Sequence, residues 1–322
     1  MLTAPDFAKK QITVVMANEG ERIALSNSNL VIRDANGKIK FQITCYRLFL
    51  VIVIGHCSIT TPLIQTARKF NFYIALMTPG FRLYSIIGAE KDGNYLLHKK
   101  QYSYNGIDIA KAITINKINN QIAELNNCRE KSEAVTEAVN SMKKYIEEIP
   151  SVNGLNELMA YEGLASKLYF KNHFTNVEWK GRQPRLKKDY VNSALDIGYT
   201  FLFTFIDVLL SVYGFDTYCG VMHRQFYMRK SLVCDIIEPF RPIIDHEIKK
   251  AINLRQIKAS DFILINKQYK LQYSESARYV KLLMSAILGH KDSIFAYIQA
   301  YYRAFMKDSP AERFPIYNLS ED

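Results

Sequence analysis

Short alternating runs of hydrophobic and polar residues dominate the first third of the chain. Residues 30–33 and 39–43 flank a turn segment that contains Asn36-Gly37, a strong local signal for a β-hairpin. Residues 48–54 are continuously apolar and rich in β-branched side chains, which predicts a strand buried on both faces. Thr60 and Pro62 then predict the start of a short helix. This part of the chain is predicted to be mostly β.

The pattern changes to helical periodicity after residues 104–106. Ile115, Ile118, Ile122 and Leu125 recur on one face of a helix, with polar groups opposite them. A charged segment, 129–149, ends at Pro150, and further helices are predicted at 152–174, 188–213, 232–253 and 275–306. The predicted fold class is α+β with two domains, an N-terminal β domain over 1–100 and a C-terminal all-α domain over 107–322, with the boundary near 98–107.

The longest apolar stretch, 199–215, carries Asp207 near its middle. A charged residue there would cost about 2.5 to 3.5 kcal/mol in a bilayer, so the stretch is predicted to be a buried core helix and no membrane is expected. Five cysteines without Cys-x-x-Cys spacing argue against a disulfide framework. With no secretory signal pattern at the start, these features favour a cytoplasmic location.

The chain is basic, with 42 Lys plus Arg against 31 Asp plus Glu and a formal net charge of +11. Such a balance favours a phosphate-rich partner, although a merely soluble basic protein fits it as well. Five positive charges lie within residues 179–188, which are either a phosphate-binding loop or a solvated basic loop. The candidate DNA-binding residues are Lys167, Lys171, Arg182, Arg185, Lys187, Lys188, Arg224 and Arg229.

One acidic residue falls on an apolar stripe of the predicted 152–174 helix. Glu162 shares the register of Leu158, Ala165 and Tyr169. An ionised carboxylate on a core-facing stripe needs a bound metal ion or a paired cation. Glu162 is therefore either a metal ligand or one partner of a buried ion pair with an arginine.

A second group of candidate ligands lies between residues 223 and 238. Asp235 and Glu238 are three positions apart, which places both carboxylates on neighbouring turns of a helix, and His223 precedes them. They lie off the apolar stripe, so solvated surface acids are the alternative, and Pro239 and Pro242 indicate a late start or a kink. Carboxylates with one histidine suit Mg²⁺ or Mn²⁺, ions that support phosphodiester chemistry.

Several ordered blocks of the chain point to a known family. They are 25–33 (LSNSNLVIR), 55–64 (GHCSITTPLI), 161–165 (YEGLA), 189–195 (DYVNSAL), 214–216 (GFD), and His223 followed by 231–242 (SLVCDIIEPFRP). On these blocks the chain resembles the CRISPR-associated integrases of the Cas1 family over nearly its whole length. Tyr190 is a departure, since many relatives have proline at that position.

The resemblance implies both a site and a reaction. Glu162, His223 and Glu238 would be the catalytic metal ligands, with Asp235 coordinating the ion or orienting a ligand. The 3′-OH of a short protospacer DNA would attack a phosphodiester at the CRISPR repeat, and the same site would cleave DNA. The N-terminal domain would form a homodimer, a Cas2 dimer would bridge two such dimers, and a Cas4-type exonuclease is a further candidate partner. A branched-DNA repair nuclease and a non-catalytic DNA-binding scaffold are the alternative functions.

Overall fold

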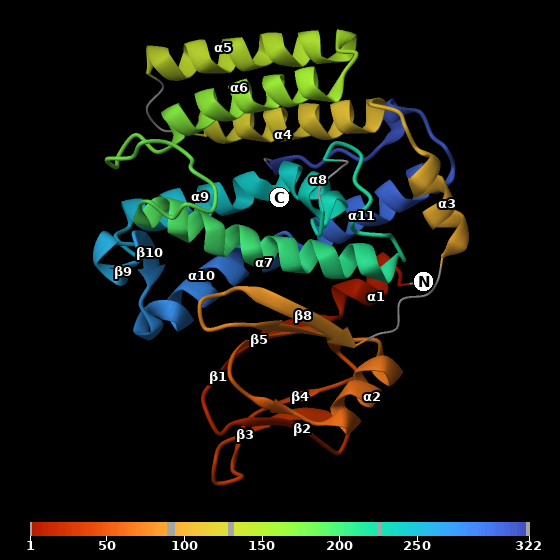
Figure 1. Cartoon of the computed structure of the whole chain (residues 1–322), viewed down its shortest axis with the longest axis vertical. Helices are drawn as coiled ribbons and strands as arrows, with labels where there is room; N and C mark the ends of the chain where they lie inside the picture. The colour runs from red at the N-terminus through yellow and green to blue at the C-terminus, as the bar shows by residue number, and fades with distance from the viewer. Residues whose placement is uncertain (1, 89–93, 128–131, 224–226, 320–322) are drawn as a thin grey trace. The chain divides into compact units, whose positions relative to one another are not determined.

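The computed structural model describes residues 2–88, 94–127, 132–223 and 227–319 (Figure 1). It divides into two compact units, Met1–Gly93 with Tyr273–Val280, and Asn94–Gln272 with Lys281–Asp322. The first unit is rich in β-strands and the second is largely helical, so the fold is α+β as predicted. The units divide between Gly93 and Asn94, ahead of the expected boundary at 98–107.

The first unit contains two four-stranded sheets. In one sheet β1 (Gln11–Ala17), β5 (Leu48–Gly55) and β7 (Tyr73–Met77) run parallel, and β8 (Leu83–Gly88) is antiparallel to β7. The other has the order β4 (Ile39–Thr44), β3 (Asn29–Arg33), β2 (Arg22–Ser26) and β6 (Ser58–Ile59). Two helices accompany them, α1 (Ala4–Ala8) and α2 (Thr61–Phe70).

The local predictions for this unit are confirmed. Strands β3 and β4 form the antiparallel hairpin, and Gly37 in its turn has φ of +81°, a conformation that glycine adopts without strain. All eight residues of β5 are buried, and the strand is central in its sheet, since it pairs with β1 on one edge and β7 on the other. Helix α2 begins after Thr60 with a proline in its first turn, as the sequence indicated.

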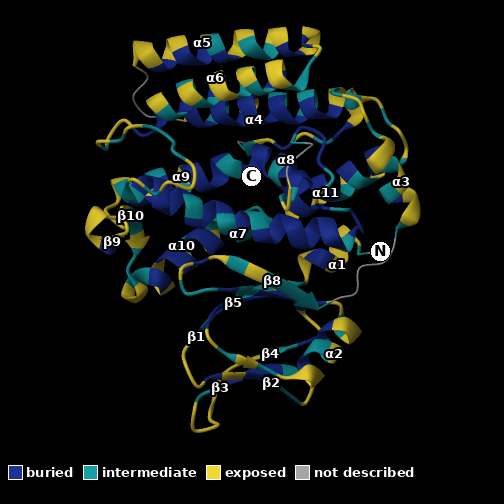
Figure 2. Cartoon of the chain, in the orientation of Figure 1, coloured by how far each residue is buried: buried dark blue, intermediate teal, exposed yellow. Residues whose placement is uncertain are grey.

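The second unit contains a packed group of three helices and a long buried helix. Helices α4 (Asp108–Asn126), α5 (Glu133–Glu148) and α6 (Leu155–His173) pack together, as Figure 1 shows. Helix α7 (Tyr190–Val212) is long and apolar enough to cross a membrane by composition, yet 78% of the relevant window is buried within the protein. Figure 2 shows α7 mostly buried, which confirms the prediction of a core helix.

Two predicted helices are interrupted in the structure. The segment expected at 232–253 is divided into α8 (Ser231–Ile236), a 3₁₀ turn at Glu238–Phe240 and α9 (Arg241–Asn253). Pro239 and Pro242 cause the break, because proline lacks an N–H and is accepted only in a first helical turn. The segment at 275–306 is divided into α10 (Ser276–Gly289) and α11 (Lys291–Met306).

Two other elements of the second unit were not predicted. Helix α3 (Tyr95–Ser103) lies where the domain boundary was expected, and a hairpin of β9 (Phe262–Ile265) and β10 (Gln268–Leu271) follows α9. The hairpin is tied to the segment before α7, since the backbone N–H of Tyr269 donates to the carbonyl of Lys187.

Candidate active site in the helical unit

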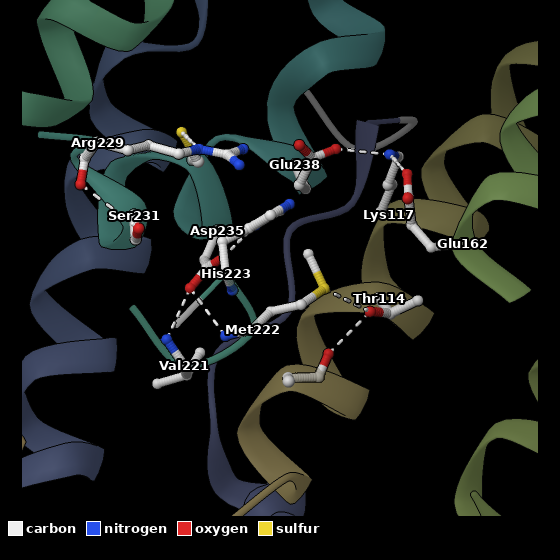
Figure 3. Close-up of polar contacts among 12 residues, drawn as sticks. Thr114, Lys117, Glu162, Val221, Met222, His223, Arg229, Ser231, Asp235 and Glu238 are labelled. Carbon is white, nitrogen blue, oxygen red and sulfur yellow. Dashed lines mark hydrogen bonds and ion pairs between the residues drawn. The ribbon is translucent and has the colours of Figure 1, made fainter. Parts of the chain in front are cut away.

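The centre of the site is a buried lysine on α4. The ammonium of Lys117 hydrogen-bonds the carboxylate of Glu162 on α6, and it lies 2.6 Å from Oε2 of Glu238 in the 3₁₀ turn (Figure 3). The side chains of Lys117, Glu162 and Glu238 are 6%, 23% and 7% exposed. Two of the predicted site residues, far apart in sequence, therefore meet on one cation.

Glu238 is held as a carboxylate by cations on both of its oxygens. Its Oε1 accepts a hydrogen bond from Nε of Arg241 at 2.9 Å, and Lys117 lies beside Oε2. Burial by itself would raise the pKa of Glu238, but Arg241 and Lys117 outweigh burial and lower the pKa to about 2. Burial likewise disfavours the charged form of Lys117, yet Glu238 and Glu162 outweigh that effect and raise the lysine pKa above its ordinary value.

His223 and Asp235 form the second half of the site. Asp235 is fully buried, and its Oδ2 accepts from the backbone N–H groups of Val221 at 2.7 Å and Met222 at 3.0 Å. Its Oδ1 accepts from the backbone N–H of His223 and lies 2.6 Å from the Nδ1 atom of that ring. With four donors, the Asp235 carboxylate shapes the loop and orients the imidazole.

This loop is also attached to α4. The hydroxyl of Thr114, one helical turn before Lys117, lies 3.6 Å from the Sδ atom of Met222 (Figure 3). Gly220 permits the tight loop, because a Cβ there would lie 2.7 Å from Oδ2 of Asp235. Helix α4 is thus the common support of both halves of the site.

The donor set fits a hard divalent ion. Oε2 of Glu238 is buried beside the Lys117 ammonium, which lies 2.6 Å away, so this oxygen is open to an ion once the ammonium moves aside. His223 uses Nδ1 on Asp235, which directs Nε2 toward a further ligand. Within the described parts of the chain, no three His, Cys, Asp or Glu side chains form a group that could hold a metal ion, and the Lys117 ammonium contacts both glutamates.

The burial of the acidic site residues differs from the prediction: Asp235 and Glu238 are more deeply buried than expected, and Glu162 is less so. Asp235 and Glu238 are 0% and 5% exposed, so the alternative of solvated surface acids is wrong for both. Glu162, expected on a core-facing stripe, is only partly buried, and its cation is a lysine rather than an arginine. A metal-ligand role for these residues stays a prediction.

Lys117 was not among the predicted site residues, because only the apolar face of α4 was used for prediction. Thr114, Lys117, Gln121 and Glu124 are all buried, so this helix is enclosed on its apolar and polar faces alike. Their spacing of three or four positions was the available signal, since it forms a polar stripe along a single helix face. Arg241, which holds Glu238, was missed in the same way.

The candidate DNA-binding residues are not equivalent. Lys167, Lys171, Arg185 and Lys188 are exposed, while Lys187 and Arg229 are partly buried. Arg229 donates from Nε to the Sγ atom of Cys234 at 3.3 Å. Arg224 lies outside the described residues.

Arg182 has internal partners. Its guanidinium donates to Oδ1 of Asn192 at 2.9 Å and to Oδ1 of Asp196 at 2.6 Å, and its side chain is 12% exposed. Both partners belong to α7, and the ring of Tyr199 on that helix lies 5.3 Å from the guanidinium carbon. These contacts fasten the basic loop to α7.

Comparisons with known proteins place this two-unit chain among CRISPR-associated proteins. The family model described as CRISPR associated protein Cas1 matches residues 14–284, and the chain belongs to that family. A CRISPR-associated endonuclease Cas1 from Archaeoglobus fulgidus is 26% identical over 309 residues, which cover 87% of this chain and 88% of that protein. One from Francisella tularensis subsp. novicida is 25% identical over 249 residues, covering 74% of this chain and 78% of that protein.

Solved structures show the same fold. A Cas1 protein from Thermotoga maritima matches with a TM-score of 0.80 and 18% identity, over 92% of this chain and 97% of that one. A chain of a Cas6-RT-Cas1–Cas2 complex matches with a TM-score of 0.81 and 21% identity over 97% of this chain, which spans only 36% of that longer chain. A casposase bound to integration product matches with a TM-score of 0.78 and 16% identity, over 96% of this chain and 94% of that one.

Proposed function

We propose that this protein is a CRISPR-adaptation integrase and DNA endonuclease that works with a divalent ion. The observation that carries the proposal is the convergence of Glu162 and Glu238 on one buried position, in a chain that belongs to the Cas1 family. The substrates are double-stranded DNA, namely a protospacer and a CRISPR repeat. This assignment draws on the named endonuclease relatives and on the likeness to a casposase bound to integration product.

The proposed ligands are Glu162, His223 and Glu238, with Mg²⁺ or Mn²⁺ as the ion. When bound, such an ion neutralises charge on phosphate oxygens and favours ionisation of an attacking hydroxyl. Asp235 has no oxygen to spare, so we assign it to orienting His223 rather than to the ion itself. Arg241 fixes one oxygen of Glu238, and the ion would take the place of Lys117 at the other.

The reaction exchanges one phosphate ester for another. The oxygen of the protospacer 3′-OH forms a bond to phosphorus at the repeat junction, and its proton passes to solvent. The bond from phosphorus to the 3′ oxygen of the repeat strand breaks, and this departing oxygen takes up a proton from solvent. With water as the attacking group, the same steps cleave DNA. The exposed cations Lys167, Lys171, Arg185 and Lys188 would hold the flanking phosphates.

The proposed assembly follows the family. The β unit would form a homodimer, and a Cas2 dimer would bridge two such dimers, which is consistent with the likeness to a chain of a Cas6-RT-Cas1–Cas2 complex. A Cas4-type exonuclease would supply trimmed DNA ends. A cytoplasmic location is part of the same proposal.

The decisive experiment replaces Glu162 by glutamine. Strand transfer into a repeat-containing plasmid should be lost because the variant removes a ligand charge, while DNA binding measured without divalent ions remains. Unfolding should shift by less than about 1.5 kcal/mol, since Lys117 keeps its contact with Glu238. Glu157→Gln, an exposed change on the same helix, is the control and should behave as wild type.

Other outcomes would favour the alternative functions. If the Glu162→Gln variant is active but destabilised by about 3 to 5 kcal/mol, Glu162 forms a structural ion pair, as expected for a non-catalytic DNA-binding scaffold. The ion pair between Lys117 and Glu162 is the observation that favours this alternative. Divalent-dependent cleavage of branched DNA without strand transfer would instead identify a repair nuclease.

A further inference from the structure

We propose that Lys117 is an internal counter-cation of the site, so that a divalent ion binds tightly only together with a DNA phosphate. The inference rests on the proposed function, because it concerns the same glutamates. It adds a regulatory consequence, namely that metal binding and DNA binding are thermodynamically coupled through one lysine.

The position of Lys117 is fixed by its helix. Asn120, three residues further along α4, donates to the carbonyl of Pro239 at 3.0 Å and to that of Tyr317 at 2.9 Å. Its Oδ1 accepts from the backbone N–H of Leu319 at 3.0 Å. These bonds tie α4 to the turn that carries Glu238, so the lysine and this glutamate keep their separation without any ligand.

The local charges nearly balance. Glu162, Glu238 and Asp235 contribute three negative charges, and Lys117 and Arg241 contribute two positive charges. Arg241 is held in place, because its guanidinium carbon lies 4.5 Å from the ring of Tyr199 while its Nε bonds Glu238. A divalent ion entering such a site produces an uncompensated positive charge, which is costly where water is largely excluded.

A DNA phosphate removes that cost. Its negative charge compensates the added ion, and the flexible four-carbon stem of lysine lets the ammonium turn from the carboxylates to a phosphate oxygen while α4 stays in place. Linkage then requires DNA to raise metal affinity and metal to raise DNA affinity by the same factor. The protein would hold its ion firmly only when the substrate is present.

The test is a calorimetric titration of the protein with Mn²⁺, with and without a short DNA duplex. The measured Mn²⁺ affinity is corrected for ion binding by the duplex itself. Wild-type protein should bind Mn²⁺ about tenfold more tightly with DNA than without it. Lys117→Met should bind Mn²⁺ about tenfold more tightly than wild type in the absence of DNA, and DNA should add little further affinity. Lys111→Met, on the same helix and paired with Asp108, should match wild type.

The outcomes separate this inference from the proposed function. If Glu162→Gln and Glu238→Gln leave Mn²⁺ binding unchanged, the proposed metal site itself is wrong. If both weaken binding but Lys117→Met leaves the affinity and its dependence on DNA unchanged, only the role of Lys117 is overturned. Should Lys117→Met fail to fold, Lys117→Gln provides the same removal of charge. Equal wild-type affinity with and without DNA would overturn the inference without any variant.

Discussion

The Nδ1 atom of His223 lies 2.6 Å from Oδ1 of Asp235, a carboxylate that also accepts three backbone N–H groups. Because this carboxylate acts as an acceptor throughout, the proton in the contact belongs to Nδ1 of the imidazole. The pair therefore sets which ring nitrogen is left to bind a ligand. Asp235 therefore stabilises the loop and orients a residue of the site.

Replacing Asp235 with asparagine should weaken the metal site without removing it. One oxygen would be lost as an acceptor and an amide N–H would face backbone N–H donors, so we expect a destabilisation of about 2 to 3 kcal/mol. Mn²⁺ affinity should fall about 10- to 100-fold, as is usual when the partner of a metal-binding histidine is changed. Calorimetry and urea unfolding on one preparation would measure both effects, and complete loss of Mn²⁺ binding in a folded variant would make Asp235 a ligand instead.

A methyl group at Gly220 should disturb the same loop. In Gly220→Ala, Cβ would lie 2.7 Å from Oδ2 of Asp235 and 2.8 Å from Cβ of Ser231, so the loop must shift. We expect reduced Mn²⁺ affinity together with a stability loss of about 1 to 3 kcal/mol. Gly154→Ala serves as a control, since a Cβ there meets nothing within 4 Å. Wild-type affinity in Gly220→Ala would show that the ring position of His223 tolerates this shift.

Two arginines of the basic loop should respond differently to alanine. Arg185 is exposed, so Arg185→Ala should lower DNA affinity and reduce the slope of log affinity against log salt by about 1. Arg182→Ala instead removes hydrogen bonds to Asn192 and Asp196 and should destabilise the protein by about 2 to 3 kcal/mol. Filter binding at several salt concentrations and thermal melting distinguish the two. A reduced salt slope in Arg182→Ala at unchanged stability would identify it as a phosphate contact.

The buried histidine of α6 should limit stability in acid. Burial first, and then the nearby Lys249, lower the pKa of His173 from 6.5 to about 3. The unfolded chain therefore takes up the proton at a higher pH, and this contribution to stability, complete above about pH 6.5, is lost as pH falls toward about 3. The expected loss is about 1.4 kcal/mol per pH unit in that window.

The variant His173→Phe tests this assignment. It keeps an aromatic ring where His173 stacks on Tyr169, with ring centroids 4.9 Å apart, but removes the titrating group. Urea unfolding between pH 4.5 and 7.5 should show a shallower loss of stability in acid than wild type. An unchanged slope would assign acid sensitivity to other groups.

Local features of this protein follow from sequence alone. Asn36-Gly37 predicts its hairpin because only a few residues accept the backbone conformation of so tight a turn. The unbroken apolar run of β5 predicts burial on both faces, and the apolar periodicity of α6 and α7 predicts helices whose bounds lie within a few residues of those observed. The residues of the site could also be named from sequence, because ordered blocks of chain resemble the Cas1 family.

Only the tertiary structure decided which polar groups are buried and what pairs with them. The polar stripe of α4 does not identify Lys117 as the partner of Glu162, and nothing in the sequence shows that distant segments bury Asp235 and Glu238. The reason is physical: a charge enters a protein interior when an opposite charge or several donors meet it there, and those groups come from residues far apart along the chain. The spacing of apolar residues predicts which face of a helix is apolar, whereas tertiary packing determines which groups contact its polar face.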